Sequence, residues 1–539
     1  MIQAASVVGK EFGIGDVAAL LPEQLSARTS SIVTALVRKE LVRPDHGGAR
    51  DAFRFRHILI RDAAYNALSK LQRAELHERF AIWLEETFPE RLSEYEEIIG
   101  YHLEQAHGYR ASLGPLDDAA RAVGLRATDH LASAARRAQM RGDVSGSINL
   151  LERSLALAPT EWEGRAEALV RLYDQLYAAG EFARALEVSR STAAWAHGNG
   201  DIATEWLMKI AGAVIEHAHT SSLAYSETRA IAEEAISIFE RLGDKHGLTR
   251  AYYLLAWTNN GSGEYTALLE NSLKAGDYAR EMGAEMLEAG VLPLIYTALF
   301  WGATPTSEGL AILDRLMARE GRAIYLRNRH GLGKAMVLGM SGELEQSRSL
   351  FQTLLTELRD LGYSLSADQF DGFAHAQIEE SVENWDTATA LVRKACDTFQ
   401  ARGEEGLFST LAGRLALLLY ETGGLDEAQH YAQLSDEAAN HDDIASQVAW
   451  RSARAEVLAA RGEADEARRY ADSAVKMADE TEVLMWQCDA HMARGEVYRL
   501  LGQKTEAAED FRRCVGLYDK KEAPLFAARA RRKLAEVTG

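Results

Sequence analysis

The chain has 539 residues, of which 47% are hydrophobic, and a formal net charge of −20 at pH 7. This length exceeds what one compact core holds, whereas a repeat array has no such limit. The negative charge argues against general binding to nucleic acid or to an anionic membrane, so we expect neither as a partner.

The three cysteines, Cys396, Cys488 and Cys514, lie far apart and show no metal-ligand spacing. We therefore expect reduced thiols in a cytoplasmic protein, with no metal site and no cofactor. No apolar run approaches the 18 residues that indicate a membrane-spanning helix. No serine, histidine and carboxylate pattern indicates catalysis, so we expect a chain that is not an enzyme.

The first residues do not follow the repeat found later in the chain. Short helices are predicted at 1–8, 15–21 and 26–39, followed by strands at 41–43 and 52–56. The alternation of apolar and basic residues from Ala52 to Arg56 is typical of a half-buried strand. Three helices and a two-stranded ribbon predict a winged-helix domain over 1–69, followed by a helical linker over 70–116.

Two segments of this region resemble a known family. Ala4-Ala5-Ser6-Val7-Val8-Gly9-Lys10-Glu11-Phe12 is similar to the start of the winged helix in bacterial STAND-type, AAA-like signalling ATPases. The run from Phe53 to Tyr65 (FRFRHILIRDAAY) resembles the F-R-H-x-L-I-R-D-x-x-Y block of the same proteins. In that family the ATPase joins a class III nucleotide cyclase or a LuxR-type DNA-binding domain to tetratricopeptide-like repeats.

The resemblance implies that the winged helix packs on an ATPase-type domain, in cis or in trans, and that His57 and Arg61 sense its nucleotide. The alternative for these two residues is local, with His57 capping the following helix and Arg61 pairing with Asp62. We expect no nucleotide-binding domain upstream. Gly331-Leu332-Gly333-Lys334-Ala335 lacks the Ser or Thr that a P-loop has after its lysine.

From 117 onward a short motif recurs about every 40 residues: a glycine, an acidic residue and a small residue between two apolar helical runs. It stands at Gly142, Gly180, Gly263, Gly342, Gly424, Gly462 and Gly502, is missing near 220–222 and survives as Asn384-Trp385. Glycine ends one helix in the left-handed conformation, and the acidic residue favours the start of the next. A period of this length indicates a helical-repeat architecture.

The predicted fold is therefore all-α: a right-handed α-solenoid of about ten tetratricopeptide-like helix hairpins over 117–539, after the winged helix. The predicted hairpins are 117–158, 162–199, 201–242, 246–282, 285–319, 323–361, 366–402, 404–440, 444–479 and 485–519. A last amphipathic helix from Pro524 to Val537 is expected to cap the array. Glu379-Glu380 and Asp442-Asp443 are interpreted as solvated faces.

The middle of the array, over 250–380, is richer in aromatic residues than its ends. In such arrays the first helix of each hairpin faces the concave surface, where aromatic side chains can hold a partner protein or a small effector. The candidate groove residues are Tyr253, Trp257, Tyr296, Phe300, Trp301, Phe373 and His375. The spacing of Tyr253 with Trp257, and of Tyr296 with Phe300, equally suits packing between hairpins.

These observations favour a non-enzymatic regulatory scaffold whose groove binds a partner or an effector. The first alternative is the remnant of an ATP-dependent signalling enzyme, such as a cyclase with an ATPase module. The second is a LuxR-type transcription regulator without its DNA-binding end. DNA binding by the winged helix itself is disfavoured because its third helix offers few basic residues.

Overall fold

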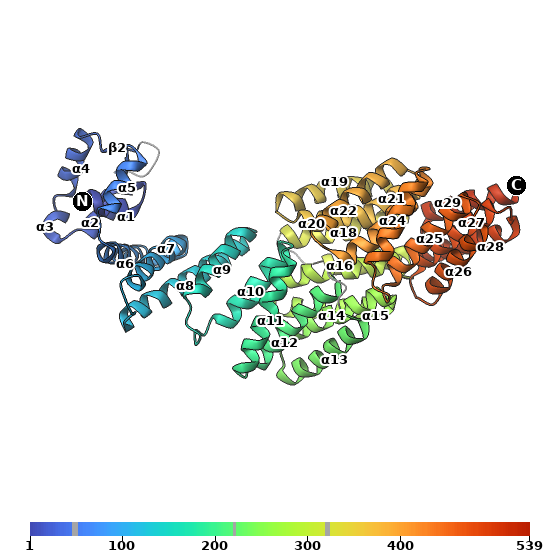
Figure 1. The fold of residues 1–539 in the computed structure, drawn as a ribbon, viewed down its shortest axis with the longest axis horizontal. Helices are drawn as coiled ribbons and strands as arrows, with labels where there is room; N and C mark the ends of the chain where they lie inside the picture. Colours follow the sequence, from blue (N-terminus) through green and yellow to red (C-terminus); the bar gives the residue numbers. More distant parts are fainter. Residues whose placement is uncertain (46–51, 219–222, 319–323) are drawn as a thin grey trace. The chain divides into compact units, whose positions relative to one another are not determined.

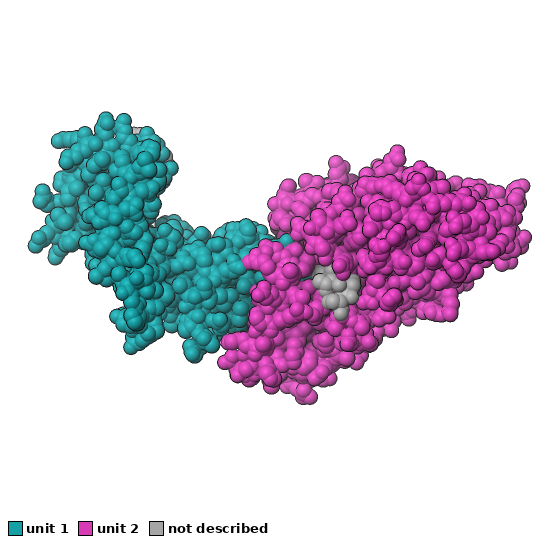
Figure 2. Space-filling model, viewed as in Figure 1, with its two compact units in different colours: residues 1–179 teal, residues 180–539 magenta. Residues whose placement is uncertain are grey.

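The computed structural model describes residues 1–45, 52–218, 223–318 and 324–539. The chain forms two compact units, Met1–Ala179 and Gly180–Gly539 (Figure 2). The boundary between the units lies within the predicted repeat array. The segment 46–51 between the two predicted strands and the missing motif near 220–222 lie outside the described residues.

The first unit opens with a small mixed domain (Figure 1). Its elements are α1 (Ile2–Val8), β1 (Glu11–Gly13), α2 (Ile14–Leu20), α3 (Glu23–Ser26), α4 (Thr29–Arg38), β2 (Val42–Pro44), β3 (Ala52–Phe55) and α5 (Ile58–Asn66). The antiparallel sheet has the order β1-β3-β2, with Glu11 opposite Arg54 and Val42 opposite Phe55. This is the predicted winged-helix arrangement with a third strand. The strand β1 is only three residues long, too short to show an alternating pattern.

Five longer helices follow in the first unit: α6 (Lys70–Thr87), α7 (Leu92–Ala111), α8 (Asp118–Met140), α9 (Val144–Leu157) and α10 (Arg165–Ala178), with a short 3-10 turn at Pro89–Arg91. One apolar core joins Phe12 and Phe55 of the sheet to Phe80 of α6 and Leu103 of α7. The winged helix and the helices after it therefore share a core.

A chain of buried polar side chains crosses α6 and α7. Nδ1 of His77 lies 2.8 Å from Nδ1 of His102, and Nε2 of His77 lies 2.8 Å from the hydroxyl of Tyr65. That hydroxyl is in turn 2.9 Å from the hydroxyl of Tyr109. Burial and the charges of Arg61 and Arg73 lower the pKa of His77 to about 4, and burial together with His77 lowers the pKa of His102 to about 3.

This pair predicts that acid destabilises the first unit. Both pKa values lie below the unfolded value of about 6.5, so the unfolded chain binds more protons as the pH falls from about 6.5 towards 4, and stability is lost in that window. The loss by pH 5 should be at least about 2 kcal/mol. Urea titrations of the full chain at pH 7 and pH 5, read by pulsed hydrogen exchange at one common pH in α6 and α7, measure it.

The matched control for that measurement is His57→Gln, which removes an exposed histidine of the same unit and should keep the full pH dependence. The double variant His77→Gln/His102→Phe should lose the dependence. A double variant that is as acid-sensitive as the natural chain would contradict the assignment.

The second unit consists of helices joined into hairpins, as predicted. Its helices are α11 (Phe182–Gly198), α12 (Ile202–Ala218), α13 (Tyr225–Leu242), α14 (Lys245–Ser262), α15 (Tyr265–Glu281), α16 (Glu285–Trp301), α17 (Thr306–Met317), α18 (Ile324–Ser341), α19 (Leu344–Asp360), α20 (Ser364–Phe370), the π-turn η2 (Asp371–His375), α21 (Ala376–Ser381), α22 (Trp385–Ala401), α23 (Glu405–Glu421), α24 (Leu425–Ala438), α25 (Ile444–Ala460), α26 (Ala464–Asp479), α27 (Leu484–Leu500), α28 (Lys504–Lys521) and α29 (Pro524–Thr538). Together with α8 to α10, these helices confirm the hairpin prediction.

The connections between the helices follow the predicted glycine motif, with differences at two positions. Gly263, Gly342, Gly462 and Gly502 have positive φ, as a helix end with a left-handed residue requires. In the motif at Gly424 the left-handed residue is Gly423, with φ 83°, and Gly424 begins the next helix. Before Asn384 the position is taken by Glu383, with φ 60°. The left-handed conformation at the helix end is therefore kept at position 383, although the residue there is a glutamate and not a glycine.

Hairpins distant in sequence also meet within the second unit. The helices α12, α14 and α16 contact α23, α25 and α27, in that order, each partner lying five hairpins later. Residues 202–401 are called the first turn below, and residues 405–522 the second turn. The capping helix α29 packs on α28 and on α18 and α21 of the first turn.

Two glutamates of the second turn cap helices of the first. Oε2 of Glu482 accepts from the backbone N–H of Thr266 at 2.8 Å, at the start of α15. Oε2 of Glu522 accepts from the N–H of Ser307 at 2.9 Å, at the start of α17. Both contacts satisfy N–H groups that a helix start leaves without an internal partner.

Lys521 of α28 also joins the second turn to the first, and none of its surface is exposed. Its Nζ donates to the carbonyl oxygens of Leu299, Gly302 and Thr304 at 2.6, 2.7 and 2.6 Å. These carbonyls stand at the end of α16, where a helix favours a cation.

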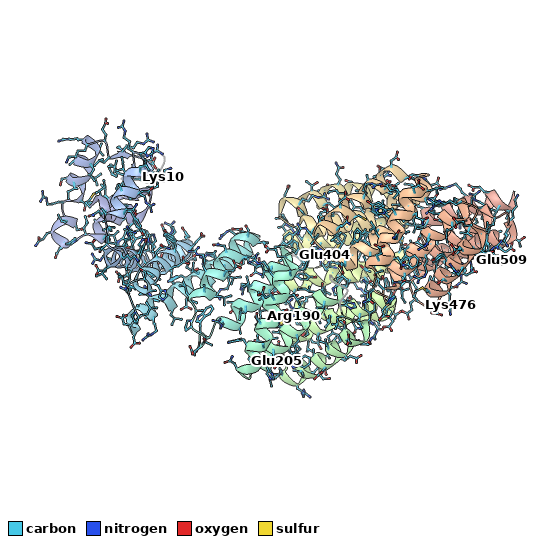
Figure 3. All side chains as sticks on the ribbon, viewed as in Figure 1. Lys10, Arg190, Glu205, Glu404, Lys476 and Glu509 are labelled. Carbon is cyan, nitrogen blue, oxygen red and sulfur yellow. The ribbon has the colours of Figure 1, made fainter. Side chains whose placement is uncertain are left out.

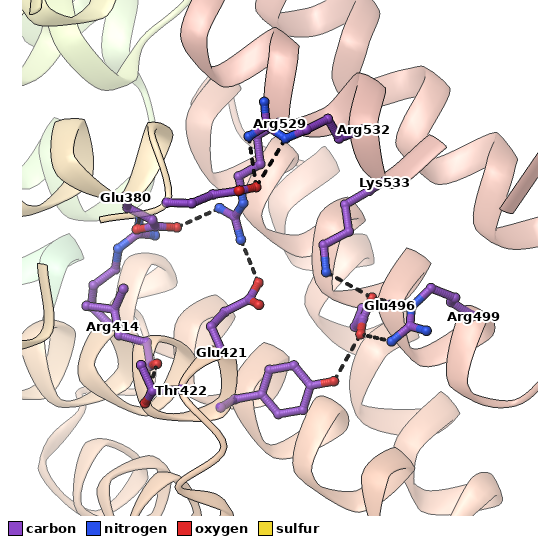
Figure 4. Close-up of polar contacts among 12 residues, drawn as sticks. Glu380, Arg414, Glu421, Thr422, Glu496, Arg499, Arg529, Arg532 and Lys533 are labelled. Atoms are coloured by element: carbon purple, nitrogen blue, oxygen red, sulfur yellow. Dashed lines mark hydrogen bonds and ion pairs between the residues drawn. The ribbon is translucent and has the colours of Figure 1, made fainter. Parts of the chain in front are cut away.

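A buried ion network fixes α29 to both turns (Figure 4). Arg529 donates to Glu380 of α21 at 2.8 Å and to Glu421 of α23 at 2.7 Å. Arg414 also pairs with Glu380 and, at 2.7 Å, with Asp489 of α27. The prediction that Glu379 and Glu380 form a solvated face is wrong, since both are buried and paired with arginines.

Other charged side chains of the second unit do lie on its surface. Lys476 of α26 and Glu509 of α28 are exposed side chains of the second helices of their hairpins (Figure 3). Every helix in the described ranges is too short or too polar to traverse a lipid bilayer.

Candidate functional site

A cavity of about 170 Å³ lies between the two turns of the second unit. Its first-turn wall consists of His217, Tyr225, Trp257, Asn260, Gly261, Tyr265, Pro293, Leu294, Thr297, Trp301, Met336, Gln369, Phe370, Phe373 and Ala374, and its second-turn wall of Gly406, Leu407, Thr410, Asn440, Asp443, Ala445 and Trp486. The groove predicted over 250–380 is therefore covered by a second wall. Most lining helices are the first helices of their hairpins, which in such arrays face inward.

The structure brings three of the predicted groove residues together. Trp257 of α14, Trp301 of α16 and Phe373 of η2 all line the cavity. Pro293 lies inside α16 on the same wall, where its missing N–H and its ring interrupt the regular helix. An aromatic wall built from several helices is typical of sites that bind small organic molecules.

The other predicted groove residues are not among those that line the cavity. Tyr296 and Phe300 have no exposed surface and belong to the apolar core between α16 and its neighbours. A Cβ at Gly333 would lie 2.4 Å from the ring of Tyr296, so α18 packs directly on it. Tyr253 packs against two core clusters. Tyr253, Tyr296 and Phe300 therefore pack between hairpins, which is the alternative that their spacing also suited.

His375 lies at the end of the π-turn and faces the helix packing instead of the cavity. Its Nδ1 is 2.9 Å from Oδ1 of Asp371, and its ring stacks on Phe351 with centroids 4.7 Å apart. Asp371 also accepts from Arg359 at 2.5 Å. Although burial opposes ionisation, the bonds from His375 and Arg359 hold the pKa of Asp371 below its usual value.

Phe373 and His375 are two residues apart, so they point to different sides of their helix, and only Phe373 lies on the cavity. Both belong to the π-turn. Its Gly372 allows close contact, because a Cβ there would lie 2.5 Å from Cβ of Ala395. Such turns often occur at functional sites.

The polar groups of the first-turn wall are mostly satisfied. The hydroxyl of Tyr265 donates to Oδ1 of Asn260 at 2.8 Å, and Nδ1 of His217 lies 3.2 Å from Oγ1 of Thr228. The exception is Nε1 of Trp257, a buried donor with no acceptor in the described chain. A buried donor without a partner costs about 1–3 kcal/mol, so this N–H favours a bound acceptor.

Sequence reasoning missed the residues that come from outside 250–380. Tyr225 and Trp486 line the cavity, and so does Asp443, which had been placed on a solvated face. Burial and the nearby carboxylates of Asp443 and Asp442 raise the pKa of Tyr225. No local signal marks Asp443 as a lining residue, because Tyr225, which lies near it on the opposite wall, is more than 200 residues away in sequence.

His57 and Arg61 both make local contacts. His57 is exposed and caps α5, its Nδ1 accepting from the N–H of Leu59 at 3.2 Å. Arg61 pairs with Asp62 at 3.1 Å and donates to the carbonyl oxygen of Ser6 at 3.2 Å. These are the contacts of the local alternative, and a nucleotide role for the two residues stays a prediction. The described residues hold no group of three or more His, Cys, Asp or Glu side chains suited to a metal ion.

No family model and no curated protein matches this sequence. Among solved structures, a Rap protein complexed with competence and sporulation factor is similar at 14% identity, with 68% of this chain and 100% of that chain covered and a TM-score of 0.49. The Cut9–Hcn1 hetero-tetramer of APC/C matches at 14% identity, 88% and 95% coverage and a TM-score of 0.44. The human IFIT1 dimer with m7Gppp-AAAA matches at 11% identity, 83% and 95% coverage and a TM-score of 0.41. The geometry of the chain itself is that of an all-α helical-repeat solenoid preceded by a winged helix.

Proposed function

We propose that this chain is a non-enzymatic regulatory protein whose repeat array binds a small effector in the cavity between its two turns. The unpartnered N–H of Trp257 in an aromatic cavity carries the proposal. Because both turns line the cavity, an occupant contacts both and favours the arrangement in which they are closed. Effector binding thereby changes the rigidity of the array, and with it the activity of an attached or associated domain.

The winged helix, in this proposal, packs on an ATPase-type domain in cis or in trans. Its resemblance to STAND-type regulators supports this, as do two apolar side chains at the start of α5. Ile58 is 43% exposed and Leu59 is 67% exposed. Apolar side chains this exposed side by side are typical of a contact surface.

The test of effector binding uses a small-molecule extract of cells and the full chain, with retained compounds identified by mass spectrometry. Trp257→Phe keeps an aromatic ring and removes only the N–H. It should therefore lower retention of the effector about tenfold, which corresponds to the free energy of one lost buried hydrogen bond. The melting temperature should be unchanged or higher.

Trp195→Phe is the matched control, since Nε1 of Trp195 is also buried and without a partner but Trp195 does not line the cavity. Retention of the compound by Trp195→Phe and its loss in Trp257→Phe support the proposal. A chain that retains no compound, or retains it equally in both variants, would overturn it. Titration with ATP and magnesium should give no heat, because no Lys or Arg stands among the described residues that line the cavity.

A further inference from the structure

The described lining of the cavity carries one formal charge. Among these described residues Asp443 is the only carboxylate, and none is a lysine or an arginine. His217 lies beside the hydroxyl of Thr228, and burial raises the pKa values of Tyr225 and Tyr265, which therefore stay uncharged. An anionic ligand would meet a carboxylate with no cation to offset it, so the charge pattern excludes phosphates and carboxylates.

Asp443 itself lacks a cation. Its Oδ2 accepts from Oγ of Ser446 at 2.6 Å, and its Oδ1 accepts from the N–H of the same residue at 3.3 Å, which caps α25. The N–H of Ala445 and the hydroxyl of Ser409 donate to it as well, so its described donors are neutral groups of the second turn. Within the described residues it has no ion-pair partner, and burial raises its pKa against the effect of these hydrogen bonds.

The two equivalent carboxylates farther along the second turn are used differently. Glu482 and Glu522 each cap a helix of the first turn, which closes the turns on each other at those levels. At Asp443 the carboxylate caps its own helix and accepts a bond from Ser409 of α23, also in the second turn, and the cavity occupies the space between the turns. Among the described residues no first-turn donor reaches Asp443, whereas Glu482 and Glu522 each have one.

The walls around Asp443 are aromatic and come from four helices and the π-turn. Tyr225, Trp257, Trp301, Phe373 and Trp486 line them. The faces of such rings attract organic cations, and the attraction strengthens when the cation is desolvated. Nε1 of Trp257, on the same wall, is a buried donor without a partner among the described residues.

We propose that the cavity selects a small organic cation, with Asp443 as its counter-ion; a hydrogen-bond acceptor on the same molecule would take the N–H of Trp257. This inference rests on the proposed function and specifies its effector. The shared chemistry is an ammonium group, whether on a free amine or on the side chain of a peptide.

The test compares three probes of one shape, phenethylamine, 2-phenylethanol and phenylacetate, titrated into the full chain and followed by tryptophan fluorescence. A lysine-containing peptide with blocked ends is added as a fourth probe to separate a peptide source from a free amine. Phenethylamine should bind at least tenfold more tightly than 2-phenylethanol, and phenylacetate should not bind.

Asp443→Asn should remove the preference for the amine, with affinity for 2-phenylethanol kept within twofold. Asparagine is an equally good helix cap, so α25 should stay folded. Asp442→Asn is the matched control, because it removes the same charge from the exposed neighbour and should leave the preference intact.

The outcomes separate the two proposals. Equal binding of the amine and the alcohol, or an unchanged preference in Asp443→Asn, would overturn the cation inference and leave effector binding standing. Binding of none of the four probes would count against both. Preference for the peptide over phenethylamine would support the cation and assign it to a peptide.

Discussion

Replacing Lys521 with methionine is expected to lower the free energy of unfolding of residues 180–539 by about 3–5 kcal/mol. Methionine is similar in length but has no donor, so the carbonyl oxygens of Leu299, Gly302 and Thr304 would be left buried and unpaired. An unpaired buried acceptor costs about 1–3 kcal/mol, and only the ammonium group of lysine has three donors in one place.

Urea denaturation of the full chain and hydrogen exchange at the start of α17 measure this effect. Lys520→Met is the matched control, since Lys520 is the exposed neighbour on the same helix, and its loss should change the free energy by less than about 0.5 kcal/mol. Equal effects of the two substitutions would show that the three carbonyl contacts do not hold the turns together.

Replacing Arg529 with methionine is expected to cost a similar amount, about 3–5 kcal/mol, because it leaves buried carboxylates without their cation. Arg529 serves Glu380 and Glu421 together, and their charges raise its pKa against the effect of burial. Nearby, burial together with the charges of Glu421 and Glu496 raises the pKa of Glu456, so the network already contains more carboxylates than it neutralises.

Arg531→Met is the comparison variant, two residues along α29. Arg531 pairs with Asp519 in solvent, with about half of each side chain exposed, and such a pair contributes about 0–1 kcal/mol. Calorimetric melting of both variants tests the difference. A small loss in Arg529→Met would mean that Arg414 alone neutralises Glu380.

The hairpins were predictable because each depends on local signals. A left-handed glycine, an acidic residue near the next helix start and an apolar stripe lie within one period, as around Gly462. Such signals need no knowledge of distant residues. They also hold where the sequence varies, since Glu383 adopts the conformation of the absent glycine.

The candidate site was only partly predictable. Trp257 and Trp301 were found because they lie on the inward helices of their hairpins. Tyr296 and Phe300 share the same helical spacing yet are buried, since pattern alone does not tell a groove from a core. His375 was misplaced because it was grouped with Phe373, which lies two residues before it and on another side of the helix, and Asp443 was missed because the chain returns five hairpins later.

The contacts between the turns have a consequence for how such a chain can change by duplication. In an open array each hairpin touches only its neighbours, so one copy can be gained or lost with little disturbance. Here Glu482 meets Thr266, and Glu522 meets Ser307, across more than 200 residues. Adding or deleting one hairpin between them would shift every later contact by one unit, so the number of hairpins in this segment is fixed by the fold.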